Sequence, residues 1–228
     1  MKEYEKILEF WDSVLKCDDI NCVSGKWISD ENFNWVLKKY INNNSVILDF
    51  GCGSGWALIE ASYTVNFKKG IGIDQSINGI KYASEVSKIS GINNIEFVCG
   101  GHKCLQRFKD VFDFGISINL VDVLPDDIVI DILKELYSSI KVGGYLVIAI
   151  NPCFSKEFLE NLGYSIVNNY IYKDGIFRGN IKTNEEWINL FEKYFELVDY
   201  KEFSLTEREK EYPRRMFVLK KSVLIGKS

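Results

Sequence analysis

The sequence predicts an α/β fold in which helices cover both faces of a mostly parallel sheet. Apolar, strand-like runs alternate with helix patterns from residue 46 to about 150, which is the arrangement of right-handed crossovers. With 228 residues, 46% of them hydrophobic, the chain is long enough for one domain with a substantial core. Two late strands follow each other without a helix between them, which predicts an antiparallel pair at one edge of the sheet.

The alternating part contains five predicted strands and three predicted helices. The first helix follows Gly55, the second runs from near Ser76 to near Gly91, and the third begins at Pro125 and ends at Gly143 and Gly144. Apolar residues recur at helical spacing in the second and third of these. The strands are predicted at residues 46–50, 69–74, 95–100, 112–119 and 145–150.

The two ends of the chain follow a different pattern. Residues 1–44 read as helices, without a strand of their own. Thr183 and Glu186 form a capping-box pattern before a further helix. We therefore expect a single domain over residues 1–228, with a helical cap at 1–44, a core at 45–150, and an insertion plus the late strands at 151–228.

Composition excludes several classes of protein. A net charge of −4 argues against a nucleic-acid footprint, and Arg214, Arg215, Lys220 and Lys221 are explained equally well as a solvated strand end. The first residues lack the apolar core of a signal peptide, and no run reaches the roughly 18–20 apolar residues of a membrane span. These observations predict a cytoplasmic protein without a membrane partner.

The six cysteines are expected to be reduced and buried. They contain no C-x-x-C pair, and His102 is the single histidine of the chain. His102 with Cys99 and Cys104 matches no strong zinc template, so no metal is expected.

Three glycines in five positions mark the candidate ligand site. Gly51, Gly53 and Gly55 follow the first strand, where an open parallel sheet binds ligands, and they let the backbone approach a ligand closely. The spacing is G-x-G-x-G, whereas a dinucleotide fingerprint needs G-x-G-x-x-G. Asp49, before the loop, suits a ligand with an amino group and a positive charge. Asp74, which ends the second strand, is placed to accept hydrogen bonds from both hydroxyls of a ribose.

Four segments resemble the class I S-adenosylmethionine-dependent methyltransferases. They are VILDFGCGSG, GIGIDQS, FDFGISINLVDVLPDD and LKELYSSIKVGGYLVIAIN. The resemblance implies a Rossmann-like, seven-stranded sheet with an antiparallel last strand, and S-adenosylmethionine as cofactor. Carried over by position, it implies that Asp49, Gly51, Cys52 and Gly53 contact the methionine part, Asp74 the ribose and Gln75 the adenine, and that Asn119 and Leu120 flank the methyl group.

The chain departs from the family after its third strand. Many relatives have an acid there that binds the adenine amino group, whereas this chain has Gly100, Gly101 and His102. Either backbone groups of Gly101 and His102 substitute for that acid, or the adenine is bound more loosely. NPCF, at 151–154, resembles the N-P-P-[FY] motif of amino-group methylases, but it follows the fifth strand instead of the fourth, so we reject a nucleic-acid methylase.

For the methyl acceptor, the resemblance and the aromatic ends of the chain lead to a small molecule, methylated at oxygen, nitrogen or sulfur. A protein or peptide methyltransferase and a catalytically silent cofactor-binding protein remain alternatives. A dinucleotide-binding domain is a third alternative, which would use a different cofactor. The oligomeric state is left open.

Asp122 is the best-placed carboxylate for a general base, and it serves equally well as a cap or a structural acid. Candidate acceptor residues are Trp11, Trp27, Phe154, Tyr172 and Arg214. The alternative is that the aromatic side chains among them only pack helices onto the sheet.

Overall fold

The computed structural model describes residues 2–16 and 31–222 of the chain. The core elements are β1 (Val46–Phe50), α3 (Trp56–Thr64), β2 (Lys69–Asp74), α4 (Ile77–Ile89), β3 (Ile95–Cys99), η1 (His102–Arg107), β4 (Phe112–Ile118), η2 (Val121–Val123), α5 (Asp126–Ser139) and β5 (Ile140–Ile150). Before them lie α1 (Lys2–Val14) and α2 (Glu31–Tyr40). After them come α6 (Lys156–Asn161), β6 (Ser165–Val167), β7 (Tyr170–Lys173), β8 (Ile176–Asn180), α7 (Asn184–Phe191), β9 (Glu196–Phe203), η3 (Glu207–Lys210) and β10 (Arg214–Lys220).

The main sheet has seven strands in the order β3-β2-β1-β4-β5-β10-β9. Strands β1 to β5 pair in parallel, and β10 lies antiparallel between β5 and β9. The predicted α/β, Rossmann-like fold with an antiparallel last strand is confirmed. Because strand order reverses between β1 and β4, the loops after these two strands diverge and leave a ligand-binding crevice at the carboxyl edge of the sheet.

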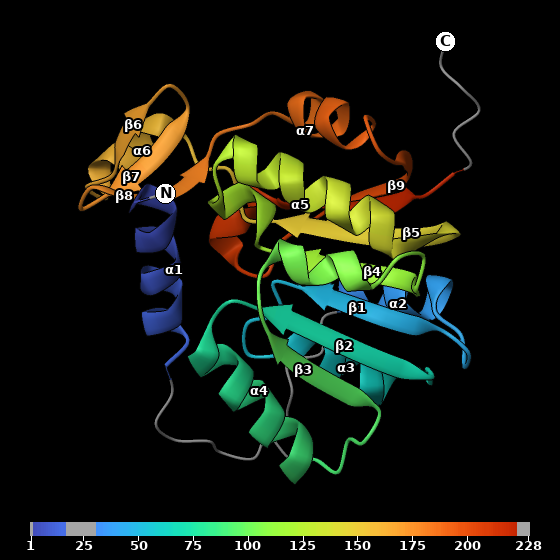
Figure 1. The fold of residues 1–228 in the computed structure, drawn as a ribbon. Coiled ribbons are helices and arrows are strands. Elements are labelled where there is room, and N and C mark those ends of the chain that lie inside the picture. Colours follow the sequence, from blue (N-terminus) through green and yellow to red (C-terminus); the bar gives the residue numbers. More distant parts are fainter. Residues whose placement is uncertain (1, 17–30, 223–228) are drawn as a thin grey trace.

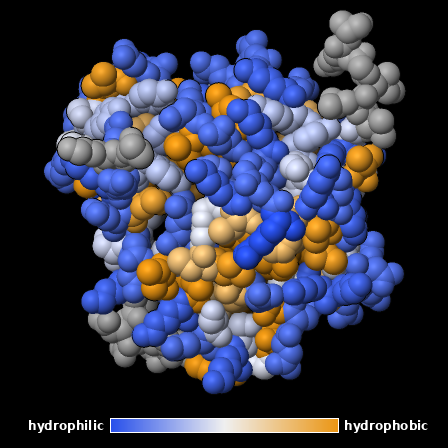
Figure 2. All heavy atoms as spheres, in the orientation of Figure 1, coloured by the Kyte–Doolittle hydropathy of each residue, from blue (hydrophilic) through white to orange (hydrophobic). Residues whose placement is uncertain are grey.

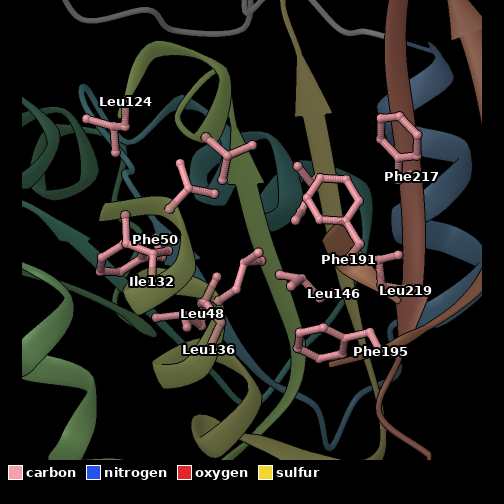
Figure 3. Packing of buried hydrophobic residues seen from close by; sticks show 14 of the residues in the cluster. Leu48, Phe50, Leu124, Ile132, Leu136, Leu146, Phe191, Phe195, Phe217 and Leu219 are labelled. Carbon is pink, nitrogen blue, oxygen red and sulfur yellow. The ribbon is translucent and has the colours of Figure 1, made fainter. Parts of the chain in front are cut away.

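Two apolar clusters hold the helices to the sheet. On one face, α5 and α7 bury residues such as Ile132, Leu136 and Phe191 against Leu48 and Phe217 of the strands (Figure 3). On the other face, α2 and α3 pack onto the sheet through Phe33, Val36, Leu37, Leu58 and Ala61. Hydrophilic residues cover much of the face seen in Figure 2, while apolar residues gather in a band across its middle and lower part. Helices thus pack onto both faces of the sheet, which fixes the positions of the strand ends.

Helix α1 lies at the carboxyl edge of the strands, beside the small sheet (Figure 1). That sheet has the order β6-β7-β8 and is antiparallel throughout. The sequence analysis treated this part of the chain as an aromatic insertion and did not predict its strands. At 3.3 Å, the guanidinium carbon of Arg178, in β8, lies over the ring of Phe10, in α1. This contact links α1 to the small sheet.

Three local expectations were wrong. Helix α5 ends at Ser139, before Gly143 and Gly144, because the chain enters β5 at Ile140 and the two glycines lie within that strand. The cysteines of the described residues are free, as expected, but only Cys52 is buried, whereas Cys99 is exposed and Cys104 and Cys153 are half-buried. Arg215 and Lys221 are buried, since β10 is an inner strand of the sheet, whereas Arg214 and Lys220 are half-buried.

The expected starts of two helices are confirmed. Ser76 caps α4 by accepting a hydrogen bond from the Gly79 backbone N–H, and Thr183 and Glu186 form the capping box of α7. Within residues 2–16 and 31–222, the structure contains no helix long and apolar enough to cross a membrane. In the same residues, no three His, Cys, Asp or Glu side chains gather where a metal ion could bind.

Candidate active site

The glycine loop after β1 has the backbone conformation that its composition predicts. Gly51, Gly53 and Gly55 have φ values of +77°, +50° and +78°, in the left-handed region that side chains disfavour. A Cβ atom on Gly55 would lie 2.7 Å from the Cβ of Ala83 and from the ring of Phe97. The loop therefore needs glycine both for its turn and for its close packing against α4 and β3.

Two carboxylates lie beneath this loop. Asp49 is 2% exposed, and its Oδ2 atom has no hydrogen-bond partner among the described residues. Burial, followed by the negative charge of Asp74, raises the pKa of Asp49 to about 8. Asp74 accepts hydrogen bonds from the backbone N–H groups of Gly53 and Ser76, each at 2.8 Å. Burial also raises the pKa of Asp74, against these two hydrogen bonds. The site therefore favours a ligand that supplies positive charge and hydrogen-bond donors.

Helix α1 forms the outer wall of the crevice. The side chains of Tyr4 and Gln75 are joined by a hydrogen bond. Asp12 accepts hydrogen bonds from the hydroxyl of Ser76 at 2.6 Å and from the amide nitrogen of the Asn78 side chain at 2.8 Å. Asp12 thus ties α1 to the first turn of α4. The sequence analysis did not identify Asp12, whose position among the mixed charges of α1 gave no signal.

The crevice contains most of the residues expected at the cofactor. Eight of those ten line it: Gly51, Cys52, Gly53, Asp74, Gln75, His102, Asn119 and Leu120. Asp49 lies buried behind the loop, and Gly100 lines the wall where Gly101 was expected. Trp11, an expected acceptor residue, lines it as well.

A second cavity adjoins the crevice. Trp11 and Val123 line both, so these two side chains separate the two spaces. Of the other residues expected at the acceptor or in catalysis, Asp122, Phe154 and Arg214 line this second cavity. Tyr172 does not line it, and its ring packs against Phe177 in the small sheet. Trp27 lies outside the described residues.

Polar side chains form one connected wall of the second cavity. Asp122 is 7% exposed, and its Oδ2 atom accepts hydrogen bonds from the backbone N–H of Asn151 at 3.0 Å and from its side-chain amide at 2.8 Å. Arg214 donates to Asn151 and to Asn119, and it forms an ion pair with Glu209 at 2.9 Å. The wall therefore reaches from the end of β4 across to β10. Asn151 was missed because a single asparagine after a strand carries no chemical pattern.

The comparison with protein families decides the class of this site. A family model described as a methyltransferase domain matches residues 47–144. Residues 47–144 of the chain form a methyltransferase domain. The resemblance to class I S-adenosylmethionine-dependent methyltransferases is thereby confirmed, and S-adenosylmethionine is the cofactor of such a domain.

Curated relatives match different shares of the chain. A malonyl-[acyl-carrier protein] O-methyltransferase of Marinomonas sp. is 34% identical over 107 residues, which are 47% of this chain and 38% of that enzyme. The chain thus spans less than half of the length of this relative. A carboxy-S-adenosyl-L-methionine synthase of Nautilia profundicola is 23% identical over 212 residues, covering 91% of this chain and 78% of that protein.

Solved structures share the fold of the methyltransferase domain and of the chain around it. The PH0226 protein of Pyrococcus horikoshii superposes with a TM-score of 0.68 at 22% identity, covering 97% of this chain and 100% of that one. At this identity the likeness concerns the fold.

The residues of the crevice fit S-adenosylmethionine. In the described residues, Oδ2 of Asp49 is a buried acceptor without a partner. Asp49 and Asp74 both have raised pKa values, and a cationic ligand in the crevice would lower the cost of ionising them. The glycine loop leaves no side chain of its own in the crevice at positions 51 and 53.

Proposed function

We propose that the chain transfers a methyl group from S-adenosylmethionine to the oxygen, nitrogen or sulfur of a small-molecule acceptor. One observation carries this proposal: a second cavity with a polar wall adjoins the cofactor crevice across Trp11 and Val123. Methyl transfer needs two ligands held side by side with water excluded, and such alignment is worth up to about 7–11 kcal/mol.

In this proposal the residues of the crevice hold the cofactor. Asp74 accepts hydrogen bonds from the ribose hydroxyls, and Asp49, with the backbone of Gly51, Cys52 and Gly53, holds the methionine part. Gln75, Gly101 and His102 lie toward the adenine, while Asn119 and Leu120 lie toward the reacting methyl group. The bound cofactor supplies a methyl group that its sulfonium already activates, so the protein's work is to orient the acceptor and exclude water.

Asp122 is the residue best placed to take a proton from the acceptor. Asn151 occupies its Oδ2 atom, and its Oδ1 atom is buried without a partner in the described part of the chain. Burial raises the pKa of Asp122, against the hydrogen bonds from Asn151, and a raised pKa suits a carboxylate that works as a general base. In our proposal this oxygen receives the proton of an acceptor hydroxyl or amine.

The second cavity favours a small acceptor over a polypeptide. Residues of α1, η2, the small sheet, β10 and the segment after β5 border it, and a hollow formed by so many segments suits a compact ligand. The Marinomonas relative is named for methylation of malonyl-[acyl-carrier protein], so an acceptor attached to a carrier protein is the second possibility.

The proposal is tested with a radiolabelled methyl donor. The purified chain is offered a metabolite extract, a protein extract and nucleic acid in separate reactions. We expect label in the metabolite fraction and none in nucleic acid. Label confined to the protein fraction would instead favour a protein or carrier-bound acceptor. Binding of S-adenosylhomocysteine without label in any fraction would leave a silent cofactor-binding protein.

A further inference from the structure

The second cavity contains more unpartnered polar atoms than any other part of the described chain. In residues 2–16 and 31–222, eight buried side-chain nitrogen or oxygen atoms lack a hydrogen-bond partner. Five of them belong to residues that line this cavity: Trp11 Nε1, Asp122 Oδ1, Arg178 Nη1, Asn180 Oδ1 and Arg215 Nε. Buried polar groups are normally paired, so this concentration indicates a ligand that would satisfy them.

Three of the five atoms are donors, and two of these belong to arginines. Arg215 is 7% exposed, and its Nη1 donates only to the Lys182 carbonyl and the Asn184 side-chain oxygen, both neutral acceptors. Arg178 stacks on Phe10. Neither arginine forms an ion pair in residues 2–16 and 31–222. The positive charge of Arg215 acts on the Asp122 carboxylate, but no carboxylate is hydrogen-bonded to either guanidinium in the described part of the chain, and an anion that binds them lowers the cost of their burial.

The other charges of the cavity leave this excess in place. Arg214 is neutralised by Glu209, through hydrogen bonds to both carboxylate oxygens at 3.0 Å and 2.9 Å. Asp122, the remaining acid, carries at most one negative charge against the two charges of Arg178 and Arg215. The lining is therefore net positive, and it fits a ligand with one negative charge better than a neutral one.

We propose that the methyl acceptor carries a carboxylate, which binds in the second cavity to Arg178 and Arg215. Planar guanidinium groups and planar carboxylates form strong, directional hydrogen bonds, and a single negative charge is tolerated beside Asp122 better than the two charges of a phosphate. Asp122 and Asn180 then accept hydrogen bonds from a hydroxyl or amino group elsewhere on the same molecule. This inference rests on the proposed function, since it names the substrate class of the same site.

Acetate serves as the probe, because it presents a carboxylate and little else. The isotope-labelled full chain is first saturated with S-adenosylhomocysteine, and the NMR signals of the Arg215 Nε–H and Trp11 Nε1–H groups are followed. Sodium acetate is added, with sodium chloride at equal ionic strength, acetamide and inorganic phosphate as separate arms. We expect a saturable shift of both signals with acetate and none with chloride or acetamide.

Variants assign the effect to the cavity. Arg178→Met is expected to weaken acetate binding about tenfold or more, as loss of a charged hydrogen bond does. Arg107→Met is the matched control, because the Arg107 side chain also lies over a phenylalanine ring, that of Phe108, but does not line the cavity. Equal responses to acetate and chloride, an unchanged Arg178→Met variant, or tighter binding of phosphate than of acetate would each overturn the inference. Failure to bind S-adenosylhomocysteine would instead count against the proposed function.

Discussion

Asp12 accepts a hydrogen bond from the hydroxyl of Ser76 at 2.6 Å, which joins α1 to the residue that caps α4. Ser76 lies two residues after Asp74, so this bond connects the outer wall of the crevice to the acid expected to bind the ribose. The position of α1 and the shape of the cofactor site are therefore coupled through one short segment.

Removing this carboxylate should loosen α1. Asp12→Ala deletes the hydrogen bonds to Ser76 and Asn78, and a bond to a charged group is worth about 1.5–3 kcal/mol. We expect backbone amides of α1 to exchange hydrogen about tenfold faster or more, with those of α5 unchanged. Asp131→Ala, which removes a surface ion pair on α5, is the control. Unaltered exchange in α1 would mean that apolar contacts alone hold the helix.

Acid should have the same effect on wild-type α1. The hydrogen bonds from Ser76 and Asn78 lower the pKa of Asp12. Its stabilisation is therefore complete above the pKa that Asp12 has in the unfolded chain, and it is lost as pH falls through the lower folded value.

Asp74 should contribute directly to cofactor affinity. Asp74→Ala removes the proposed acceptor for the ribose hydroxyls, and we expect S-adenosylhomocysteine to bind more weakly by about 1–3 kcal/mol in calorimetry. Asp131→Ala, which removes a carboxylate outside the crevice, is again the control. Equal affinity in the Asp74 variant would remove this residue from the ribose site.

Asp49 should make the unliganded protein less stable as pH rises. Its pKa of about 8 in the fold exceeds that of an exposed aspartate, so the folded chain binds more protons than the unfolded chain between the two values. In this window stability falls by up to about 1.4 kcal/mol per pH unit. We expect Asp49→Asn to flatten this dependence in denaturant titrations from mildly acidic to alkaline pH. A slope identical to that of the wild type would show that Asp49 is ionised throughout.

Comparing Gly55 with Gly163, which have the same φ, separates the cost of backbone strain from the cost of crowding. Gly55 and Gly163 both have φ of +78°, but a Cβ on Gly163 meets nothing within 4 Å, whereas one on Gly55 meets Ala83 and Phe97 at 2.7 Å. Gly163→Ala should cost about 1–2 kcal/mol of strain. Gly55→Ala should cost a further 1–3 kcal/mol or so from overpacking. Equal losses of unfolding free energy would show that α3 and α4 shift to accept the methyl group.

Asp122→Asn should separate catalysis from binding. If Asp122 accepts a proton from the acceptor, the variant loses about 10²–10⁴-fold in kcat while its affinity for S-adenosylhomocysteine is kept. The wild-type rate should rise with pH through the raised pKa of Asp122, and the rise should vanish in the variant. A variant with a normal rate and pH profile would leave Asp122 as a structural partner of Asn151.

The sequence was informative where local chemistry determines structure. Gly51, Gly53 and Gly55 indicate a left-handed turn because few other residues adopt it, and Ser76 and Thr183 indicate helix starts because their hydroxyls satisfy free backbone N–H groups. The number of strands in the sheet and the antiparallel last strand came with the family resemblance, whereas the strand order came from the structure.

The second cavity could not be predicted in the same way. Arg178, Asn151 and Arg215 come from β8, the end of β5 and β10, and only the folded chain brings them together. Nor did the short strands β6 to β8 stand out, because their sequence mixes polar and aromatic residues without a clear alternation. The small sheet is therefore a product of tertiary packing more than of local pattern.

Trp11 borders both cavities, and this has a kinetic consequence. Because α1 forms the outer wall of the crevice, we expect the cofactor to enter and leave when that helix moves aside, and an acceptor bound against Trp11 would hold the helix in place. We therefore expect a compulsory order of events: the methyl donor enters first, the acceptor follows, the methylated product departs, and S-adenosylhomocysteine leaves last. Product inhibition by S-adenosylhomocysteine should accordingly be competitive toward the donor alone.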